Sequence, residues 1–429
     1  MKIIRRAQEN YQEELSSLLN RSAFSSDIDS QVAEILAEVR LHGDAALCEF
    51  ARKFDHVELT PAQFAVGDAE CNTASQKITA EVRDAIAIAV QQVTDFARQR
   101  LPKKWSFSPR PGVTLGEQFS PLSRVGCYIP GGTAPLISTV VHTVSLAAAA
   151  GVPEIVVVTP PGPNGQVNPA LLHACRIAGA TEIYRLGGVY GIAALAYGSE
   201  SVRKVEKIVG PGNAYVTAAK RQVYGQVALD LVAGPSEIMI IADASANPAF
   251  IAADMLSQAE HGSGREQAVL LTTAPELLLQ VRAELQRQSA LLRRSDCVHK
   301  VLSKGVFLLE AASLDEAVEL ANRYAPEHLE LMLAQPEEIA AKITAAGAIF
   351  LGHWTPEPVG DFVAGPSHVL PTGGSGKYFT GLTVEMFFRR SSLVQYNREA
   401  LTRELPYIRC FAECEGLDAH GNSAAIRLS

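Results

Sequence analysis

Short apolar runs that alternate with helix-like segments constrain the fold of this chain more than any other feature. Runs such as EIVVVTP (154–160) and SEIMIIAD (236–243) are separated by segments with the apolar spacing of helices. Continuous apolar strands are typical of parallel sheets that helices cover on both faces. A second series of this kind extends from about residue 250 to 353. The chain is therefore predicted to have an α/β fold with two parallel sheets.

The composition indicates a globular protein of more than one domain. The 429 residues are 47% hydrophobic, which is sufficient for a sizeable core. The net charge is −8 without a Lys/Arg cluster, so neither nucleic acid nor a membrane surface is expected as a partner. The chain shows no apolar signal sequence and no long membrane-spanning stretch. Its 7 scattered cysteines indicate free thiols and a cytoplasmic location.

Two adjacent titratable residues, Glu327 and His328, follow a proline at a predicted helix-to-strand junction. Pro326 disfavours helix in the residue before it and so ends the helix of 313–325. The residues after it, HLELML, alternate as in a half-buried strand. Loops at the edge of an open sheet often carry functional groups. One interpretation is that one of the two residues acts as the base for water and the other as a proton shuttle. The other interpretation is a solvated Glu beside a His that bonds a carbonyl.

Several predicted strands end in glycines that a helix follows. These are IPGG (129–132), RLGG (185–188) and VGPGN (209–213). Such turns let backbone N–H groups approach an anion, usually a phosphate. None is a complete G-x-G-x-x-G, so the dinucleotide fingerprint is absent. Any one of them is explained by a tight turn, but together at one sheet edge they favour a nucleotide or phosphate ligand.

Several side chains suit a divalent cation. Gln258 and His261 have the i, i+3 spacing near a predicted helix end, so both point the same way. Asp361 and His368 lie in a Gly/Pro-rich loop, and His420 lies near the C-terminus. Imidazole and carboxylate ligands suit Zn²⁺. Because no short motif such as H-E-x-x-H occurs, ordinary surface or core roles stay open for these residues.

A set of segments, taken together, resembles the histidinol dehydrogenase family. The segments are VGCYIPGG, IVGPGNAYVTAAKRQV, LDLVAGPSEIMIIAD, DMLSQAEHG, YAPEHLEL, GDFVAGPSHVLPTGG and EGLDAHG. They occur in the order and at the spacing of that family, over nearly the whole chain. The resemblance implies two Rossmann-like domains with small N- and C-terminal extensions, in a domain-swapped homodimer.

The resemblance also implies domain boundaries. Residues 1–24 form the N-terminal extension, and residues 25–128 with 238–384 form the first domain, which carries the metal and catalytic residues. Residues 129–237 form the second domain, on the NAD side. Residues 385–429 form the C-terminal extension, which is exchanged with the partner subunit and agrees with the short elements seen there.

The activity that the resemblance implies is the NAD-dependent oxidation of L-histidinol to L-histidine, the last step of histidine biosynthesis. His328 is expected to accept the alcohol proton, and Glu327 to activate water. One Zn²⁺ per subunit is expected on Gln258, His261, Asp361 and the partner's His420. Substrate contacts are expected from Ser236, Gln258, His261, His328, Asp361, His368, Glu415 and His420. NAD contacts are expected from Tyr128, Tyr190 and Asn213.

A few residues differ from the family's usual pattern and keep other interpretations open. Val189-Tyr190-Gly191 stands where Ala-Gln-Ala is usual, His142 and Leu146 replace Met and Pro, and Ser367 replaces Asn. One alternative is a zinc-dependent dehydrogenase of the same fold that acts on another amino alcohol or a polyol. A metal-dependent hydrolase that does not bind NAD is a second, and a binding protein without catalysis is a third.

Overall fold

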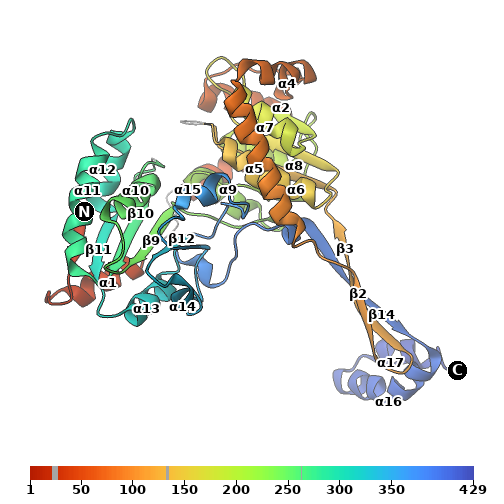
Figure 1. Ribbon diagram of the computed structural model, residues 1–429. Coiled ribbons are helices and arrows are strands. Elements are labelled where there is room, and N and C mark those ends of the chain that lie inside the picture. The colour runs from red at the N-terminus through yellow and green to blue at the C-terminus, as the bar shows by residue number, and fades with distance from the viewer. Residues whose placement is uncertain (22–27, 132–134, 262) are drawn as a thin grey trace.

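Two parallel β-sheets form the centres of two lobes, and an antiparallel ribbon carries a smaller helical unit away from them (Figure 1). The computed structural model describes residues 1–21, 28–131, 135–261 and 263–429. The predicted α/β class with two parallel sheets is confirmed. Within these ranges we find no helical segment with the length and apolar character that crossing a bilayer requires.

Sheet A has six parallel strands in the order β1-β11-β10-β9-β12-β13. They are β1 (Lys2–Ile4), β9 (Glu237–Ala242), β10 (Gln267–Thr272), β11 (Val306–Glu310), β12 (His328–Met332) and β13 (Ala348–Leu351). Alternate side chains enter two apolar clusters, because successive strand residues point to opposite faces. One cluster includes α10 (Pro248–Ala259), α11 (Pro275–Ser289) and α12 (Ser295–Lys304). The other includes α1 (Tyr11–Leu19), α13 (Leu314–Tyr324) and α14 (Pro336–Ala340).

Sheet B has five parallel strands in the order β6-β5-β4-β7-β8. They are β4 (Arg124–Tyr128), β5 (Glu154–Val158), β6 (Glu182–Tyr184), β7 (Lys207–Val209) and β8 (Ala228–Leu229). One face packs against α5 (Ala80–Arg98), α6 (Ile137–Ala149) and α7 (Pro169–Ala178). The other packs against α2 (Asp29–Phe50), α8 (Gly188–Tyr197) and α9 (Ala214–Val223). The π-helix η1 (Ala51–Asp55) continues α2, and two short helices, α3 (Pro61–Phe64) and α4 (Asp68–Ala74), complete this lobe.

The packing of the N-terminal part corrects the domain boundaries expected from the sequence. Residues 25–128 are expected to join 238–384, but α2 and α5 pack on sheet B. The segment 1–24 is expected to be a separate extension, but β1 pairs with β11 at the edge of sheet A. The boundary at residue 24 itself lies outside the described residues. An amphipathic helix reveals its apolar face but not which sheet covers it, so the sequence could not assign these helices.

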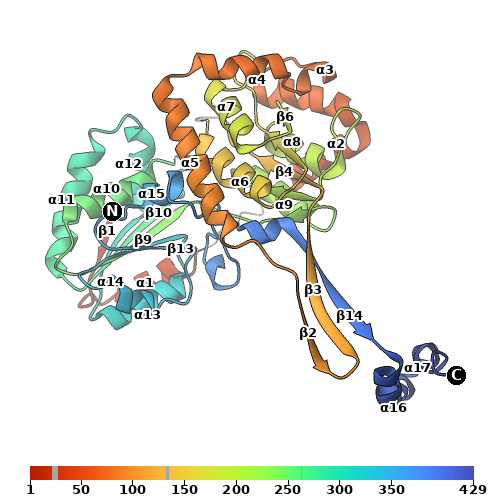
Figure 2. The ribbon, with the colours of Figure 1, turned by 45° about the vertical axis from the view of Figure 1, so that its right-hand side comes forward.

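Sheet C forms an arm that extends away from both lobes (Figures 1 and 2). Its antiparallel strands are β2 (Trp105–Arg110), β3 (Val113–Pro121) and β14 (Phe388–Tyr396), in the order β14-β3-β2. The arm ends in α16 (Arg398–Glu415) and α17 (Asp418–Ala425). The C-terminal segment is therefore an appendage. The pairing of β3 with β14 joins distant parts of the chain and was not expected from the sequence.

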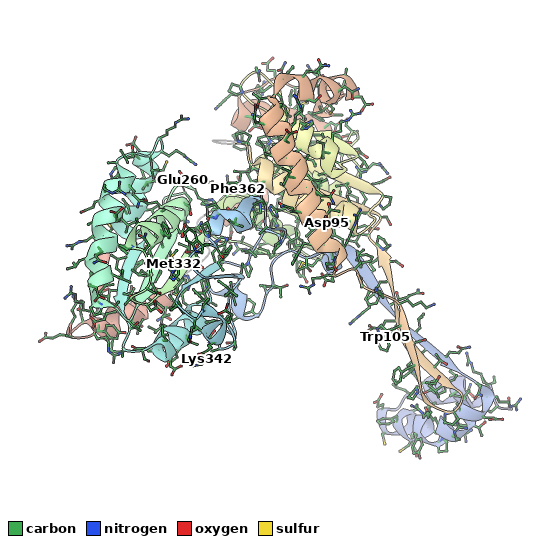
Figure 3. All side chains as sticks on the ribbon, in the orientation of Figure 1. Asp95, Trp105, Glu260, Met332, Lys342 and Phe362 are labelled. Carbon is green, nitrogen blue, oxygen red and sulfur yellow. The ribbon has the colours of Figure 1, made fainter. Side chains whose placement is uncertain are left out.

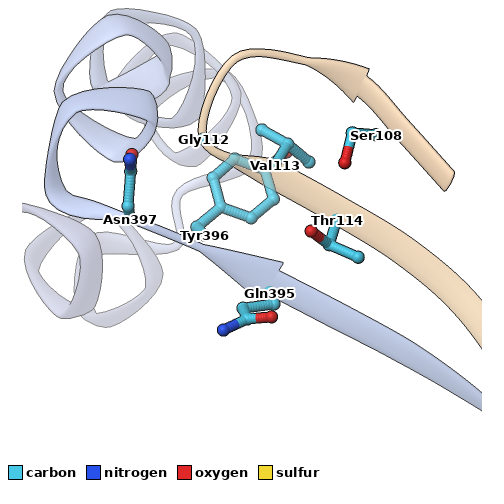
Figure 4. A pocket seen from close by; sticks show the side chains of 7 residues that line it. All are labelled: Ser108, Gly112, Val113, Thr114, Gln395, Tyr396 and Asn397. Carbon is cyan, nitrogen blue, oxygen red and sulfur yellow. The ribbon is translucent and has the colours of Figure 1, made fainter. Parts of the chain in front are cut away.

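Polar contacts hold the helices of the arm to its ribbon. Figure 4 shows Tyr396 and Asn397 at this junction, beside a shallow pocket. The Tyr396 hydroxyl accepts a hydrogen bond from Arg110 Nη2 at 2.7 Å and donates to Glu404 Oε2 at 2.8 Å. The Asn397 side chain caps α16 by accepting from the Ala400 N–H at 2.9 Å. These contacts fix the direction in which α16 leaves the ribbon.

The first residues of β4, β5 and β6 form an ion-pair cluster in which Arg124 is buried and the two glutamates are partly exposed. Arg124 Nη1 donates to Glu182 Oε1 at 2.6 Å and to Glu154 Oε2 at 3.0 Å, and its Nη2 donates to Glu182 Oε2 at 2.7 Å. The guanidinium of Arg124 lowers the pKa of Glu182 to about 2. The cluster therefore stabilises the strand order β6-β5-β4 while these carboxyl groups are ionised.

We predict that Glu182→Gln lowers the free energy of unfolding at neutral pH by roughly 1.5–3 kcal/mol, the range for hydrogen bonds to charged groups. The folded-state pKa of Glu182 is depressed to about 2. Its contribution is thus complete above the unfolded-state pKa, about 4.3, and is lost as the pH falls towards 2. Urea unfolding of both proteins across this acidic range measures the difference. A difference that does not shrink with falling pH would contradict the prediction.

Candidate active site

Glu327 and His328 lie where α13 ends and β12 begins, at the amino edge of sheet A. The helix ends at Tyr324, and Ala325 takes the left-handed conformation with φ 52° before Pro326. This confirms the predicted helix end to within one residue. Strand β12 is buried along its whole length rather than half-buried, because helices cover both faces of sheet A.

The imidazole of His328 is held through one nitrogen and leaves the other free. Its Nδ1 lies 3.1 Å from the carbonyl oxygen of Glu237, so we assign the proton to Nδ1 as the donor. Its Nε2 has no hydrogen-bond partner among the described residues. This nitrogen lies 3.7 Å from Glu357 Oε1 and 3.9 Å from Asp361 Oδ1. Burial lowers the pKa of His328, so the ring is a neutral base at neutral pH.

The carboxyl group of Glu327 is buried beside the same backbone. Its Oε2 accepts a hydrogen bond from the Glu237 N–H at 2.8 Å. Burial raises the pKa of Glu327 well above its ordinary value, and the neighbouring carboxylates act in the same direction. The interpretation of Glu327 as a solvated residue is therefore wrong. The interpretation of His328 as a residue that bonds a carbonyl is confirmed, but this contact leaves Nε2 available.

Two stacked histidines, His142 and His368, lie beside Asp361. His368 Nδ1 lies 3.6 Å from Asp361 Oδ1. Its ring stacks on His142 of α6, with centroids 4.5 Å apart and an interplanar angle of 27°. The Ser367 hydroxyl donates to the His142 carbonyl at 3.0 Å. Two of the residues that differ from the family's usual pattern, His142 and Ser367, are thus in contact. Burial lowers the pKa of His142 to about 4, so this ring is neutral.

Two observations, at Gln258 and at His328, fit a divalent cation. Gln258 is fully buried, and neither its Oε1 nor its Nε2 has a partner within the described ranges. Buried polar atoms without partners are rare and cost about 1–3 kcal/mol each, so a ligand is expected there. Potential ligand atoms of His328, Glu357 and Asp361 lie within 4.8 Å of one another. Burial and the Glu357 charge raise the pKa of Asp361, and a cation would offset this repulsion.

Glu357 was missed in the sequence analysis. It lies on α15 (Glu357–Phe362), between the two lobes, and Figure 3 labels Phe362 at the end of that helix. The Ser257 hydroxyl donates to Glu357 Oε2 at 3.0 Å. The i, i+4 spacing of Glu357 and Asp361 in EPVGD would place both on one helix face. This spacing in the sequence could have identified Glu357 as a neighbour of Asp361.

One chain brings together only part of the predicted site. Glu327, His328, Asp361 and His368 lie close to one another. Gln258 lies near the end of α10, and His261 follows that helix as an exposed residue. Ser236 directly precedes β9 and is partly buried. Glu415 and His420 are exposed on the helices at the far end of the arm (Figures 1 and 2).

The residues expected to contact NAD lie at the carboxyl edge of sheet B. Tyr128 ends β4, and its hydroxyl accepts from the Gly188 N–H at 3.2 Å, at the start of α8. Tyr190 is buried, and its hydroxyl donates to Asp55 of η1. Asn213 is exposed, and its side chain caps α9. The hydroxyl of Tyr190 is therefore already bonded within the protein, and its contact with a cofactor stays a prediction.

A buried ion pair supports the glycine turn that precedes Asn213. Gly210 has φ +112°, and a Cβ there would lie 2.2 Å from the Tyr128 carbonyl oxygen, so only glycine fits. Lys220 Nζ donates to Asp230 Oδ1 at 2.6 Å and to the Gly210 carbonyl at 2.7 Å. Asp230 Oδ2 accepts from the Gly210 N–H at 2.7 Å. Of the other predicted glycine turns, Gly132 lies outside the described residues.

We predict that Lys220→Met lowers the free energy of unfolding by about 3–5 kcal/mol, because it leaves the buried Asp230 carboxylate without its cation. Lys342→Met is the matched control, since it breaks an exposed pair of the same length with Asp315, 2.6 Å. Its expected cost is below about 1 kcal/mol. Urea unfolding at pH 7 compares the two variants, and equal losses would contradict the structural role of the buried pair.

Known proteins match the chain over nearly its whole length. A family model described as histidinol dehydrogenase matches residues 19–428. Histidinol dehydrogenase from Heliobacterium mobile is 43% identical over 411 residues, 96% of each chain. The enzyme of that name from Gloeobacter violaceus is 46% identical over 400 residues, covering 93% of this chain and 90% of the relative.

A solved structure gives the same result for the fold. The crystal structure of histidinol dehydrogenase from Elizabethkingia anophelis superposes with a TM-score of 0.94 at 34% identity. The match covers 100% of this chain and 98% of the other. The resemblance that the sequence motifs indicated is thereby confirmed. This chain belongs to the histidinol dehydrogenase family.

Proposed function

We propose that this protein is an NAD-dependent dehydrogenase that oxidises L-histidinol to L-histidine, the last step of histidine biosynthesis. The reaction consumes two NAD⁺ and one water per histidinol and passes through the aldehyde. Membership of the family over nearly the whole chain supports this activity. The observation that carries the proposal is the neutral, buried imidazole of His328. Its Nε2 is unbonded in the described part of the chain and faces the carboxyl groups of Glu357, which is buried, and Asp361, which is partly exposed.

His328 acts as the base in both oxidation steps of this proposal. In the first step its Nε2 accepts the hydroxyl proton of the alcohol while a hydride leaves the same carbon for NAD⁺. The hydrogen bond between Nδ1 and Glu237 keeps the free electron pair on Nε2. After water has added to the aldehyde, the same nitrogen accepts a proton from the resulting gem-diol as the second hydride leaves.

Glu327 activates the water that adds to the aldehyde. A carboxyl group with a raised pKa is a stronger base once it is ionised, and burial raises the pKa of Glu327. The hydrogen bond from the Glu237 N–H to Oε2 sets the plane of the carboxylate. Two adjacent residues thus have separate tasks, with His328 accepting the proton during each hydride transfer and Glu327 activating the water between them.

One Zn²⁺ would be held by Gln258, His261, Asp361 and His420 of the partner subunit. The unbonded amide of Gln258 and the crowded carboxyl groups at Asp361 support a cation there. When bound, the metal would orient the substrate. Ser236, His368 and Glu415 would contact the substrate as well, and Glu357 lies within reach of the same ion.

A homodimer with exchanged arms would complete this site. Glu415 and His420 are exposed at the end of an arm that points away from both lobes of its own chain. The arm also exposes large apolar side chains, among them Trp105, Tyr407 and Phe411. A second copy of the chain would cover these side chains and receive both residues. NAD would bind along Tyr128, Tyr190 and Asn213, and a cytoplasmic location stays a prediction.

A second candidate function rests on the contact of His142 with His368. The His142 ring occupies the space behind a histidine expected to touch the substrate, and in this family a methionine is usual at that position. A dehydrogenase for another amino alcohol or a polyol would use the same base and cation. Comparison of kcat/KM for L-histidinol with that for other amino alcohols distinguishes the two.

The first test of the function is the amount of NADH formed per L-histidinol consumed. The expected ratio is two, and a chelator should abolish turnover until zinc is added back. A ratio of one with accumulation of the aldehyde would exclude the four-electron reaction. Turnover that persists after complete removal of the metal would exclude the role of zinc.

The substitutions His328→Asn and Glu327→Gln test whether His328 accepts the proton in both oxidation steps and Glu327 activates only the water. His328→Asn should lower kcat of both oxidation steps by roughly 100- to 10,000-fold, the usual contribution of a general base. Glu327→Gln should slow chiefly the oxidation of the aldehyde, because only that half requires water. Single-turnover kinetics started from the alcohol and from the aldehyde separate the halves. Equal losses in both halves for Glu327→Gln would refute its specific role.

Mixing two inactive variants tests the exchanged dimer. His420→Ala and His328→Asn chains, unfolded and refolded together, form hybrid dimers in which one site receives the intact arm and retains the intact base. Activity should therefore return to at most half of the wild-type value per hybrid dimer. Refolding each variant alone is the control. Failure of activity to return, with dimers demonstrated by sedimentation, would contradict the exchange.

A further inference from the structure

We propose that Arg21 is a positioning residue that aligns Glu327 and His328 through Glu237. The proposal rests on the roles proposed above for these two residues. Both of them bond the backbone of one residue, because the Glu237 N–H donates to Glu327 and the Glu237 carbonyl accepts from His328. A group that fixes Glu237 therefore fixes both functional side chains at once.

The side chain of Glu237 is held by Arg21 with two parallel hydrogen bonds. Arg21 Nε lies 2.5 Å from Glu237 Oε1, and Arg21 Nη2 lies 2.8 Å from Glu237 Oε2. Both side chains are buried, with 9% and 5% of their surfaces exposed. This two-point geometry fixes the plane of the carboxylate as well as its distance, which a single point charge would not do.

Arg21 also contacts the helix that leads into Glu327. Its guanidinium carbon lies 3.4 Å from the centre of the Tyr324 ring. Tyr324 is fully buried at the end of α13, and its hydroxyl donates to Gln267 Oε1 at 2.7 Å. Gln267 begins β10 and pairs with Glu237 across the sheet. Arg21 thus lies between the start of β9 and the end of α13, the two elements that carry the contacts of the pair.

The N-terminal segment brings Arg21 to this place. Strand β1 pairs with β11, and α1 buries Tyr11, Leu15 and Leu18 in the core of the first lobe. Arg21 follows α1 closely and is therefore anchored by packed structure. A segment that the sequence analysis assigned to a separate extension consequently supports the candidate active site.

Loss of the guanidinium would leave the Glu237 carboxylate buried without its partner. Such a group moves towards water or takes up a proton, and either change releases the backbone at the start of β9. The hydrogen bonds to Glu327 and His328 would then lengthen or lose their alignment. Small displacements in a catalytic geometry have large effects on rate, up to about 100-fold for 1 Å.

The substitutions Arg21→Gln and Arg21→Lys test the proposal in the full-length, zinc-loaded protein. Arg21→Gln should lower kcat for both oxidation steps by roughly 10- to 100-fold, while zinc content and KM for NAD⁺ change less than about twofold. Arg21→Lys should lie between wild type and Arg21→Gln, because it restores the charge without the two-point geometry. A third variant, Arg21→Ala, leaves room for a free guanidinium ion. Guanidinium ion at a non-denaturing concentration should partly restore kcat of this variant, and sodium chloride should not.

Arg6→Gln is the matched control for this series. Arg6 lies on the same N-terminal segment and pairs with Glu316 at the opposite end of α13, but the pair is partly exposed. It should leave kcat unchanged. A loss in this control as large as that in Arg21→Gln would mean that the whole segment acts through stability, and would overturn the proposal.

A double substitution separates positioning from general damage. In the His328→Asn background, Arg21→Gln should cause little further loss in the residual rate of alcohol oxidation, the half that does not use Glu327, because the residue that Arg21 aligns for that half is already absent. The same fold-loss in both backgrounds would overturn the proposal. Full activity of His328→Asn alone would instead refute the proposed base, a result that is recognisable without any Arg21 variant.

Discussion

The parallel pairing of β12 with β9 determines the geometry of the candidate active site. His328 lies opposite Ile238 in this register, so the preceding residue, Glu237, presents its N–H and carbonyl to Glu327 and His328. A shift of the register by one residue would move each side chain to the other face of the sheet. Because helices cover both faces of sheet A, such a shift would also move the side chains of the strand out of the apolar clusters in which they pack. The stability of the sheet and the alignment of the two residues therefore depend on the same contact.

Several polar groups of the predicted site are buried without complete pairing in the described residues. The amide of Gln258, the Nε2 of His328 and the Oε1 of Glu357 have no partner there. Burial lowers the pKa of His328 and raises the pKa of Asp361 and Glu327, so the charged form of each is disfavoured. A neutral base, ionisable carboxyl groups and free ligand atoms in one place suit a site that binds a cation and moves protons.

The arm divides the residues expected from the resemblance between two places in one chain. The pair at sheet A is formed by the chain's own core, while Glu415 and His420 lie on helices at the end of an antiparallel ribbon. The contacts of Tyr396 and Asn397 hold those helices to the ribbon. The arm is thus built as a distinct element, in agreement with the proposal that it serves a second subunit.

The sequence by itself determined the fold class and the family, and it indicated Glu327 and His328 as candidates for the site, because apolar periodicity and residue motifs are local properties. The helix end before Pro326 was predictable for the same reason. The place of α2 and α5, the pairing of β3 with β14 and the approach of Arg21 to Glu237 were decided only by the tertiary structure. The tertiary structure also decided the burial of Glu327, because a sequence cannot distinguish a buried glutamate from a solvated one. It likewise decided that Glu357 lies close to His328. Contacts between residues far apart in the chain depend on which apolar surfaces cover one another, and periodicity shows that a face is buried without showing its partner.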